Sequence, residues 1–251
     1  YSHCSWRCAS CLRGRVVSLP VIVTRAQPGA DETAARLRAA GYKPILSPAL
    51  VLEPLSTDLD LSGVTDLVFT SANGVRHFPA VSDSVQRVWC VGEATAEAAR
   101  KAGWRGVREG NGNAVDLAEH IIAAPEARTG VFLHIANEGA AGDLIARLTA
   151  AGVNARFAAL YRTLPVSAVA DGAASALTRA ARAVILVHSA KGAAAFRNAA
   201  RGLDLRRSIV VAISEAASKP LVGCGAKAVV NAAQPSETAL MEALDTAVLA
   251  L

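Results

Sequence analysis

The stretch "FTSANGVRHF", residues 69–78, is repeated in outline as "VHSAKGAAAF", residues 187–196. In each copy an apolar strand end is followed by a serine, a turn of small residues and a helix. A serine in this place predicts a helix N-cap, because its side-chain oxygen accepts a hydrogen bond from a free backbone N–H group. The N–H groups and the dipole of a helix start also attract carboxylates or phosphates. Two such corners therefore indicate either simple caps or a pair of binding surfaces for an anionic ligand.

The two corners belong to a longer repeat of four strand-and-helix units. The first copies begin near residues 19, 65, 87 and 110, and the second copies begin near residues 130, 182, 208 and 231. Gly41 and Gly152 follow the first helix of each copy, where a left-handed cap is expected. Alternating strands and helices form parallel sheets that are covered on both faces and bind ligands at the carboxyl ends of strands. The repeat predicts two similar α/β lobes, whose corners we expect to line one cleft.

Composition and charge narrow the class of protein. The chain has 251 residues, 52% of them hydrophobic and 19% charged, which is a globular composition with room for two lobes. The formal net charge of +5 favours an anionic partner. Basic residues are scattered and no recognition motif is present, so nucleic acid is not an expected partner. No apolar run approaches the roughly 18 residues of a membrane span, so no membrane association is expected.

Residues 1–19 differ from the rest of the chain and are predicted to be a disordered extension. They hold Cys4, Cys8 and Cys11, three of the five cysteines, with His3 as the nearest candidate for a fourth metal ligand. That spacing gives no convincing zinc site. Nothing in the sequence requires disulfides, so the expected location is the reducing cytoplasm.

The usual catalytic motifs are absent. The sequence has no phosphate loop, dinucleotide fingerprint, zinc-protease helix or nucleophile elbow. No histidine is accompanied by a metal-binding cluster, and neither Ser71 nor Ser189 has a base at motif spacing. The residues alone predict a bilobal protein that binds a ligand with several carboxylates or phosphates. The function itself stays open at this point. The protein could be an enzyme that acts on such a ligand, including a phosphosugar enzyme, or a non-catalytic binding or sensor domain for a polyanionic small molecule.

An ordered set of motifs resembles the uroporphyrinogen-III synthase family over residues 20–250. The set comprises "VIVTRAQPGADETAARLRAAG", "LVFTSANGVRHF", "VWCVGEATAEAARKAG", "YRTLP" and "VAISEAASKPLVGCG" with "AAQPSETALMEAL". The resemblance implies a cyclising lyase that converts the linear tetrapyrrole hydroxymethylbilane to uroporphyrinogen III, with inversion of the last pyrrole ring and loss of water. It implies no metal or cofactor. The implied partners are this small-molecule substrate, which carries eight carboxylates, and, transiently, the preceding pathway enzyme.

The resemblance also implies the domain organisation. Two flavodoxin-like α/β lobes, each a parallel sheet flanked by helices, are joined by a two-stranded β-ladder, and one lobe is discontinuous. The implied bounds are 20–42 plus 166–251 for lobe 1, 54–155 for lobe 2, and 43–53 with 156–165 for the ladder.

Two catalytic residues are implied by the match to family motifs. Tyr161 matches the tyrosine that faces the cleft and is expected to donate a hydrogen bond that assists departure of the hydroxyl group. The alternative for Tyr161 is a strand tyrosine packed on the ladder. Thr95 matches a threonine near the cleft, and its alternative is a hydroxyl bonded to its own helix. The residues expected to bind substrate are Arg25, Thr70, Ser71, Asn73, Gly92, Glu93, Ser189, Lys191 and Ser214. A structural ion pair is the alternative for Arg25.

The chain departs from the family pattern in the stretch "AISEAAS". Ala216 and Ala217 stand near the place where many members have threonine, so a hydroxyl role would pass to Ser214 or Ser218. Pro220 lies inside the expected helix and is predicted to kink or shorten it, because proline removes an N–H donor.

Overall fold

A computed structural model describes residues 17–56, 58–79, 85, 87–140, 143–180 and 182–249. Residues 1–16, with the cysteines of the predicted extension, lie outside the described residues. The last three residues assigned to the extension instead begin strand β1 (Val17–Val23). The apolar run "VSLPVIV" is continuous, so the strand starts earlier than its most hydrophobic part indicates.

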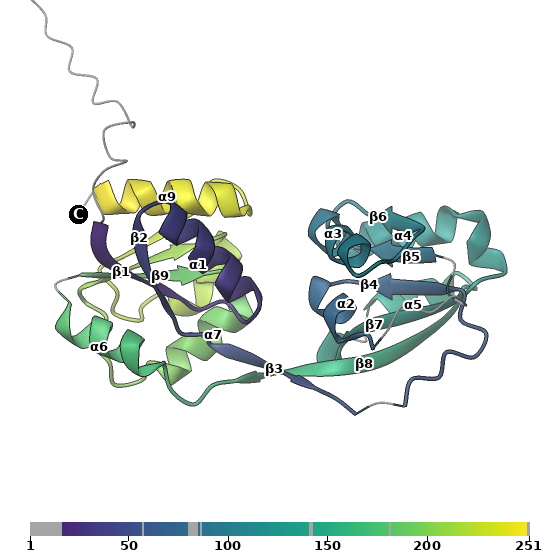
Figure 1. Ribbon diagram of the computed structural model, residues 1–251, viewed down its shortest axis with the longest axis horizontal. Helices are drawn as coiled ribbons and strands as arrows, with labels where there is room; N and C mark the ends of the chain where they lie inside the picture. The colour runs from purple at the N-terminus through teal and green to yellow at the C-terminus, as the bar shows by residue number, and fades with distance from the viewer. Residues whose placement is uncertain are drawn as a thin grey trace, which may run out of the picture. The chain divides into compact units, whose positions relative to one another are not determined.

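The described chain divides into two compact units (Figure 1). One unit comprises the described residues up to Val51 and from Leu164 onward, and the other runs from Leu52 to Thr163. The first unit contains β1, α1 (Gly29–Ala39), β2 (Tyr42–Leu46), α6 (Asp171–Arg179), β9 (Ala183–Val187), α7 (Ala190–Ala199), β10 (Ser208–Ala212), α8 (Glu215–Ser218), the 3-10 helix η4 (Lys219–Leu221), β11 (Ala228–Asn231) and α9 (Glu237–Leu249). The second contains β4 (Asp66–Phe69), α2 (Ala72–His77), β5 (Arg87–Cys90), α3 (Glu93–Lys101), β6 (Val107–Glu109), α4 (Ala114–Ala123), η2 (Pro125–Arg128), β7 (Val131–Asn137), η3 (Glu138–Ala140) and α5 (Asp143–Ala150). Strands β3 (Leu50–Pro54) and β8 (Asn154–Pro165) cross the boundary between the units.

The sheet of the first unit is parallel, with strand order β11-β10-β9-β1-β2. Numbered along this unit, the order is 2-1-3-4-5, which is the flavodoxin-like arrangement. Every residue of β9 and β10 is buried. Leu37 of α1 and Leu240 of α9 belong to the core on one face of the sheet, and Phe196 of α7 belongs to the core on the other. Figure 1 shows α9 and α7 on opposite sides of these strands.

The sheet of the second unit has the order β3-β8-β7-β4-β5-β6. Val75 of α2 and Ala96 of α3 pack on one face, whereas Leu117 of α4 and Leu148 of α5 pack on the other. The predicted α/β class and the twofold repeat of four strand-and-helix units are confirmed, but neither sheet is built from a single copy of the repeat. The first sheet joins β1 of the first copy to β9, β10 and β11 of the second, and the second sheet joins β4, β5 and β6 of the first copy to β7 of the second.

The segment 43–53, assigned to the ladder from the sequence, divides between two sheets. Strand β2 pairs in parallel with β1, and its Tyr42 is 8% exposed in the core beside α9. Strand β3 pairs with β8, as the bonds Leu55 N–H to Leu160 O (2.9 Å) and Val166 N–H to Ala49 O (3.1 Å) indicate. Both segments look extended in sequence, and only β3 pairs with β8 as the predicted ladder requires.

Local signals at helix ends are confirmed. Gly41 and Gly152 have φ values of 85° and 79°, which are left-handed conformations that favour glycine. Helix α8 has four residues and passes into η4, which contains Pro220. Proline therefore ends the regular helix early, as predicted.

Candidate active site

The carboxyl edge of the second sheet gathers most of the residues predicted for that unit. Strands β8, β7, β4 and β5 are neighbours in this sheet. Tyr161 lies on β8, Ser71 follows β4 and Gly92 follows β5. Because parallel strands end at the same edge of a sheet, the sequence-distant corners come together there.

Ser71 caps helix α2. Its Oγ accepts a hydrogen bond from Asn73 N–H at 3.1 Å. The preceding residue, Thr70, has its Oγ1 3.0 Å from Nε2 of His134 on β7. His134 is 1% exposed, and burial lowers its pKa to about 4, so its ring is neutral at pH 7. The corner thus combines a helix cap with a partly buried hydroxyl–imidazole contact.

Tyr161 contacts the same corner from β8. Tyr161 is 4% exposed, and its phenol lies close enough to the Ser71 hydroxyl for that group to affect the phenol's pKa. The ring of His77 stacks on the Tyr161 ring, with centroids 4.7 Å apart and planes at 24°. Burial raises the pKa of Tyr161, and the nearby Ser71 hydroxyl offsets only part of that rise. Tyr161 is therefore a protonated hydrogen-bond donor at neutral pH.

The start of helix α3 accounts structurally for three further predicted residues. Thr95 is 5% exposed, and its N–H donates to the carbonyl of Gly92 at 3.1 Å. A side chain at Gly92 would place its Cβ 3.1 Å from the Cα of Gly112, so glycine allows the two loops to approach. Glu93 is exposed in the first helical turn, where the helix dipole favours an acidic residue.

The carboxyl edge of the first sheet brings together the predicted residues of the other unit. Ser189 caps α7 by accepting from Gly192 N–H at 3.1 Å, and Ser214 caps α8 by accepting from Ala217 N–H at 3.2 Å. Lys191 is exposed in the first turn of α7. These residues form a second serine-capped edge within their own unit.

Arg25 is engaged by an acidic residue that the sequence analysis did not select. Its Nη1 lies 2.6 Å from Oε1 of Glu237 on α9, and its side chain is 35% exposed. The guanidinium group crosses Gly29, where a Cβ would lie 2.3 Å from Arg25 Nε. Burial raises the pKa of Glu237, but His188 and Arg25 outweigh it and leave that pKa below its ordinary value. The ion-pair alternative for Arg25 is thus realised in this structure.

Two histidines of the second unit, His77 and His134, were not among the residues selected from the sequence, yet both contact predicted site residues. His77 lies four residues after Asn73, so a helix places both on one face, and its Nδ1 donates to the Asn73 carbonyl at 2.8 Å. The four-residue spacing from Asn73 was the sequence signal that could have identified His77 as a site residue. His134 reaches Thr70 through pairing of β7 with β4, which no local pattern specifies.

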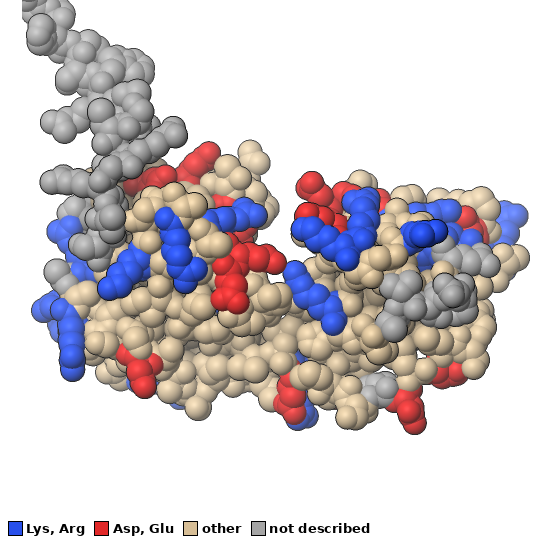
Figure 2. Space-filling model, in the orientation of Figure 1, with Lys and Arg blue, Asp and Glu red and all other residues tan. Residues whose placement is uncertain are grey.

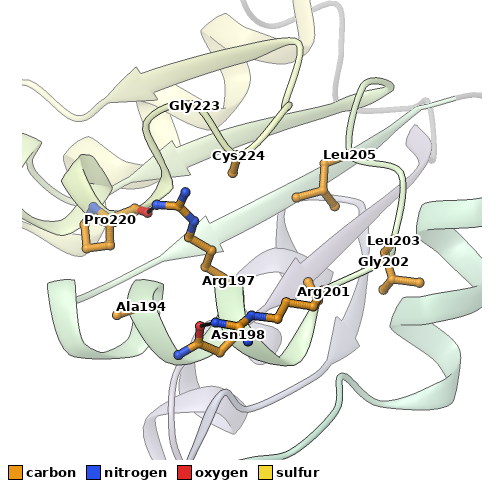
Figure 3. Close-up of a pocket in the computed structure, with 11 residues that line it drawn as sticks. Ala194, Arg197, Asn198, Arg201, Gly202, Leu203, Leu205, Pro220, Gly223 and Cys224 are labelled. Atoms are coloured by element: carbon orange, nitrogen blue, oxygen red, sulfur yellow. Dashed lines mark hydrogen bonds between the residues drawn. The ribbon is translucent and has the colours of Figure 1, made fainter.

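A separate hollow of about 550 Å³ lies in the first unit (Figure 3). It is lined by the last turns of α7 and by loops that lead into β10 and β11, so it is at the amino edge of the sheet. Arg197 Nη1 donates to Pro220 O at 2.9 Å, and Arg201 Nη2 donates to Asn198 Oδ1 at 3.1 Å. These contacts tie α7 to η4 and brace its end, and ligands of such sheets bind at the opposite edge.

Three further observations concern surface charge, metal ligands and membrane spans. Figure 2 shows basic and acidic side chains interspersed on the face that it draws of each unit. Within the described ranges, no group of three or more His, Cys, Asp or Glu side chains could hold a metal ion. In the same part of the chain, each helix is too short or too polar to cross a membrane.

Comparison with known proteins was made on sequence and on structure. The family model described as uroporphyrinogen-III synthase HemD matches residues 31–242. A uroporphyrinogen-III synthetase structure from Helicobacter pylori 26695 is 17% identical with a TM-score of 0.62, covering 92% of this chain and 99% of that one. A mutant uroporphyrinogen III synthase structure from the extremely thermophilic bacterium Thermus thermophilus is 16% identical with a TM-score of 0.53, covering 93% and 100%. None of the curated proteins compared matches the sequence. The structural likenesses show the shared fold, and the family match over most of the chain shows that it belongs to the uroporphyrinogen-III synthases, cyclising lyases of heme biosynthesis.

Proposed function

We propose that Tyr161 and Ser71 act as a hydroxyl pair that assists loss of water from hydroxymethylbilane. The two side chains carry one O–H group each and lie close together, so a hydrogen bond between them would use one of the two protons. Ser71 Oγ accepts from Asn73 N–H, so the cap requires neither O–H proton. One proton would therefore be available to the departing hydroxyl oxygen. The closeness of the two hydroxyls, beside a cap that needs only an acceptor, supports the assignment of the two residues.

The proposed step is general-acid assistance to ionisation. The bond between the terminal methylene carbon and its hydroxyl oxygen breaks, and the oxygen receives the donated proton. Water departs, and an azafulvenium-like cation remains. The last pyrrole ring then attacks through its substituted carbon, a spiro intermediate forms, and ring opening and reclosure give the inverted product with loss of a proton. The protein's main task is orientation, because the free substrate also closes unaided to the un-inverted isomer.

We also propose that the serine-capped edges bind the substrate's carboxylates. Hydroxyls and helix-start N–H groups supply the donors, and the +5 net charge favours the anion. The proposed set is Arg25, Thr70, Asn73, Gly92, Glu93, Ser189, Lys191 and Ser214, with Thr95 assisting catalysis from α3. Arg25 would share or exchange its Glu237 partner when a substrate carboxylate binds.

Two further assignments rest on the family's chemistry. We propose that the preceding pathway enzyme delivers the substrate by transient contact, because free hydroxymethylbilane closes to the wrong isomer. We place the protein in the cytoplasm, where Cys90 and Cys224, both free thiols, would remain reduced.

A product assay tests the proposed function. Hydroxymethylbilane is generated in situ with the preceding enzyme, the protein is added, and the oxidised uroporphyrin isomers are separated by chromatography. A large excess of isomer III over a protein-free control is expected. Isomer I alone from folded protein would reject the synthase assignment and leave a non-catalytic polyanion-binding protein.

A further inference from the structure

We propose that His77 is a positioning residue that holds the Tyr161 phenol against Ser71. The inference rests on the proposed role of Tyr161 in the reaction. His77 ends helix α2, the helix that Ser71 begins, so one short helix carries both groups that contact the phenol. The sequence motif "SANGVRH" thus supplies a neighbouring hydroxyl and a stacking partner for the same side chain.

The strand that carries Tyr161 does not define the direction of the phenol by itself. Pairing of β7 with β8 is regular up to Ala136 with Ala159 and then shifts, so that Asn137 lies opposite Tyr161. Such an irregularity places an extra residue, here Leu160, in one strand and re-aims the side chains beside it. A contact from outside the strand is needed to fix the ring.

His77 has the geometry to provide that contact. Its Nδ1 lies 2.8 Å from the Asn73 carbonyl oxygen, which is an acceptor only, so Nδ1 carries the proton and the imidazole plane is fixed. That fixed plane stacks on the phenol at 4.7 Å and 24°. His77 therefore holds the Tyr161 ring, whose hydroxyl lies near that of Ser71.

A double-mutant cycle separates positioning from general stability. His77→Ala is expected to lower kcat at least fivefold with KM changed less than twofold. His77→Phe keeps a stacking ring and should restore kcat to within twofold of the wild type. In a Tyr161→Phe background, His77→Ala should have little further effect, because no phenol oxygen is left to position. An equal loss of kcat in both backgrounds would overturn the proposal.

A spectroscopic readout makes the test independent of catalysis. The chain has three tyrosines, so 3-fluorotyrosine labelling gives a simple ¹⁹F spectrum in which Tyr161→Phe assigns the Tyr161 signal. His77→Ala should shift or broaden that signal, and His77→Phe should do so less. His120→Ala is the matched control. His120 lies on another helix of the same unit, α4, and its ring contacts Trp89 and not Tyr161.

The two hypotheses fail in different ways. Isomer I alone from the wild type would reject the proposed function, whereas the ¹⁹F spectrum would still report on the ring. A Tyr161 signal unchanged by His77→Ala, in protein with a wild-type thermal melt, would reject the positioning role even if isomer III is formed.

Discussion

At the scale of the residue, buried polar side chains define the candidate site. Tyr161 and His134 are each less than 5% exposed, and each is close to a hydroxyl group of the turn that follows β4. Burial disfavours the charged form of both groups, so both are neutral at pH 7. The site therefore offers neutral hydrogen-bond donors and acceptors, which suits assistance to a leaving hydroxyl.

Replacing Tyr161 by Phe should lower turnover at least tenfold and leave the fold intact. The change removes only the phenol oxygen and keeps the ring that stacks on His77. Loss of one general-acid contribution typically lowers rates by about a hundredfold or more, and unaided ionisation of the substrate reduces the expected loss. The rate of isomer III formation and a thermal melt are the measurements. An unchanged rate would remove Tyr161 from the mechanism.

His134 should make stability fall with acid before the carboxylates titrate. Its pKa is about 4 in the folded protein and 6.5 when exposed, so the unfolded chain binds more protons between those values. The free energy of unfolding is then lost as pH falls through that window, by about 2 kcal/mol between pH 7 and pH 5.

Urea unfolding at both pH values checks this expectation. His134→Gln should reduce the pH dependence, whereas His120→Gln, at an exposed position, should leave most of it. If the free energy of unfolding changes equally between pH 7 and pH 5 in the wild type and in His134→Gln, His134 is not the responsible group.

At the level of single helices, the serine corners act as N-caps, and a test of substrate binding must distinguish that role from capping. Ser71, Ser189 and Ser214 each accept a hydrogen bond from a backbone N–H of their helix. The sequence predicted the caps at Ser71 and Ser189, because the relevant partners lie two or three residues apart, whereas the cap at Ser214 was not predicted. Capping needs only an acceptor, so a negatively charged acceptor would keep the cap. The same charge would repel a substrate carboxylate, and this difference separates the two roles.

Ser189 offers a clean separation of the two roles. Ser189→Ala should destabilise the protein by about 1 kcal/mol, the usual effect of losing an N-cap. Ser189→Asp should keep the cap and the stability but place a negative charge where a carboxylate is proposed to bind, raising KM severalfold. Thermal melts and steady-state kinetics of both variants are required. If Ser189→Asp leaves KM unchanged, Ser189 is a cap and does not contact substrate.

At the scale of the whole molecule, the two units differ in how the chain builds them. Residues 52–163 form one continuous segment with its own sheet and two core clusters. The other unit needs two segments, because β1 lies between β9 and β2 and its Val21, Ile22 and Val23 are fully buried.

A fragment of residues 52–163 should therefore fold alone, and a fragment of residues 164–251 should not. The second fragment lacks β1, so β9 would lose its neighbour and the apolar surface that β1 covers. Circular dichroism and urea unfolding of both fragments are the measurements, with cooperative unfolding expected only for the first. Cooperative unfolding of 164–251 would contradict the discontinuous organisation.

The strand-and-helix units, their twofold repeat, the caps at Ser71 and Ser189 and the family could all be predicted from the amino-acid sequence. Those features depend on residues a few positions apart, such as Ser71 with Asn73 or Gly41 after its helix, and on motifs kept in order. They required no knowledge of distant contacts.

The pairing of remote segments is known only from the folded protein. Residue order does not show that β1 joins strands of the second copy, that β2 leaves the ladder for a sheet, or that Arg25 meets Glu237. The contact of His77 with Tyr161 likewise joins a helix end to a strand far along the chain. Such pairings are selected by burial of apolar surface between remote segments, and a local pattern carries no record of the partner.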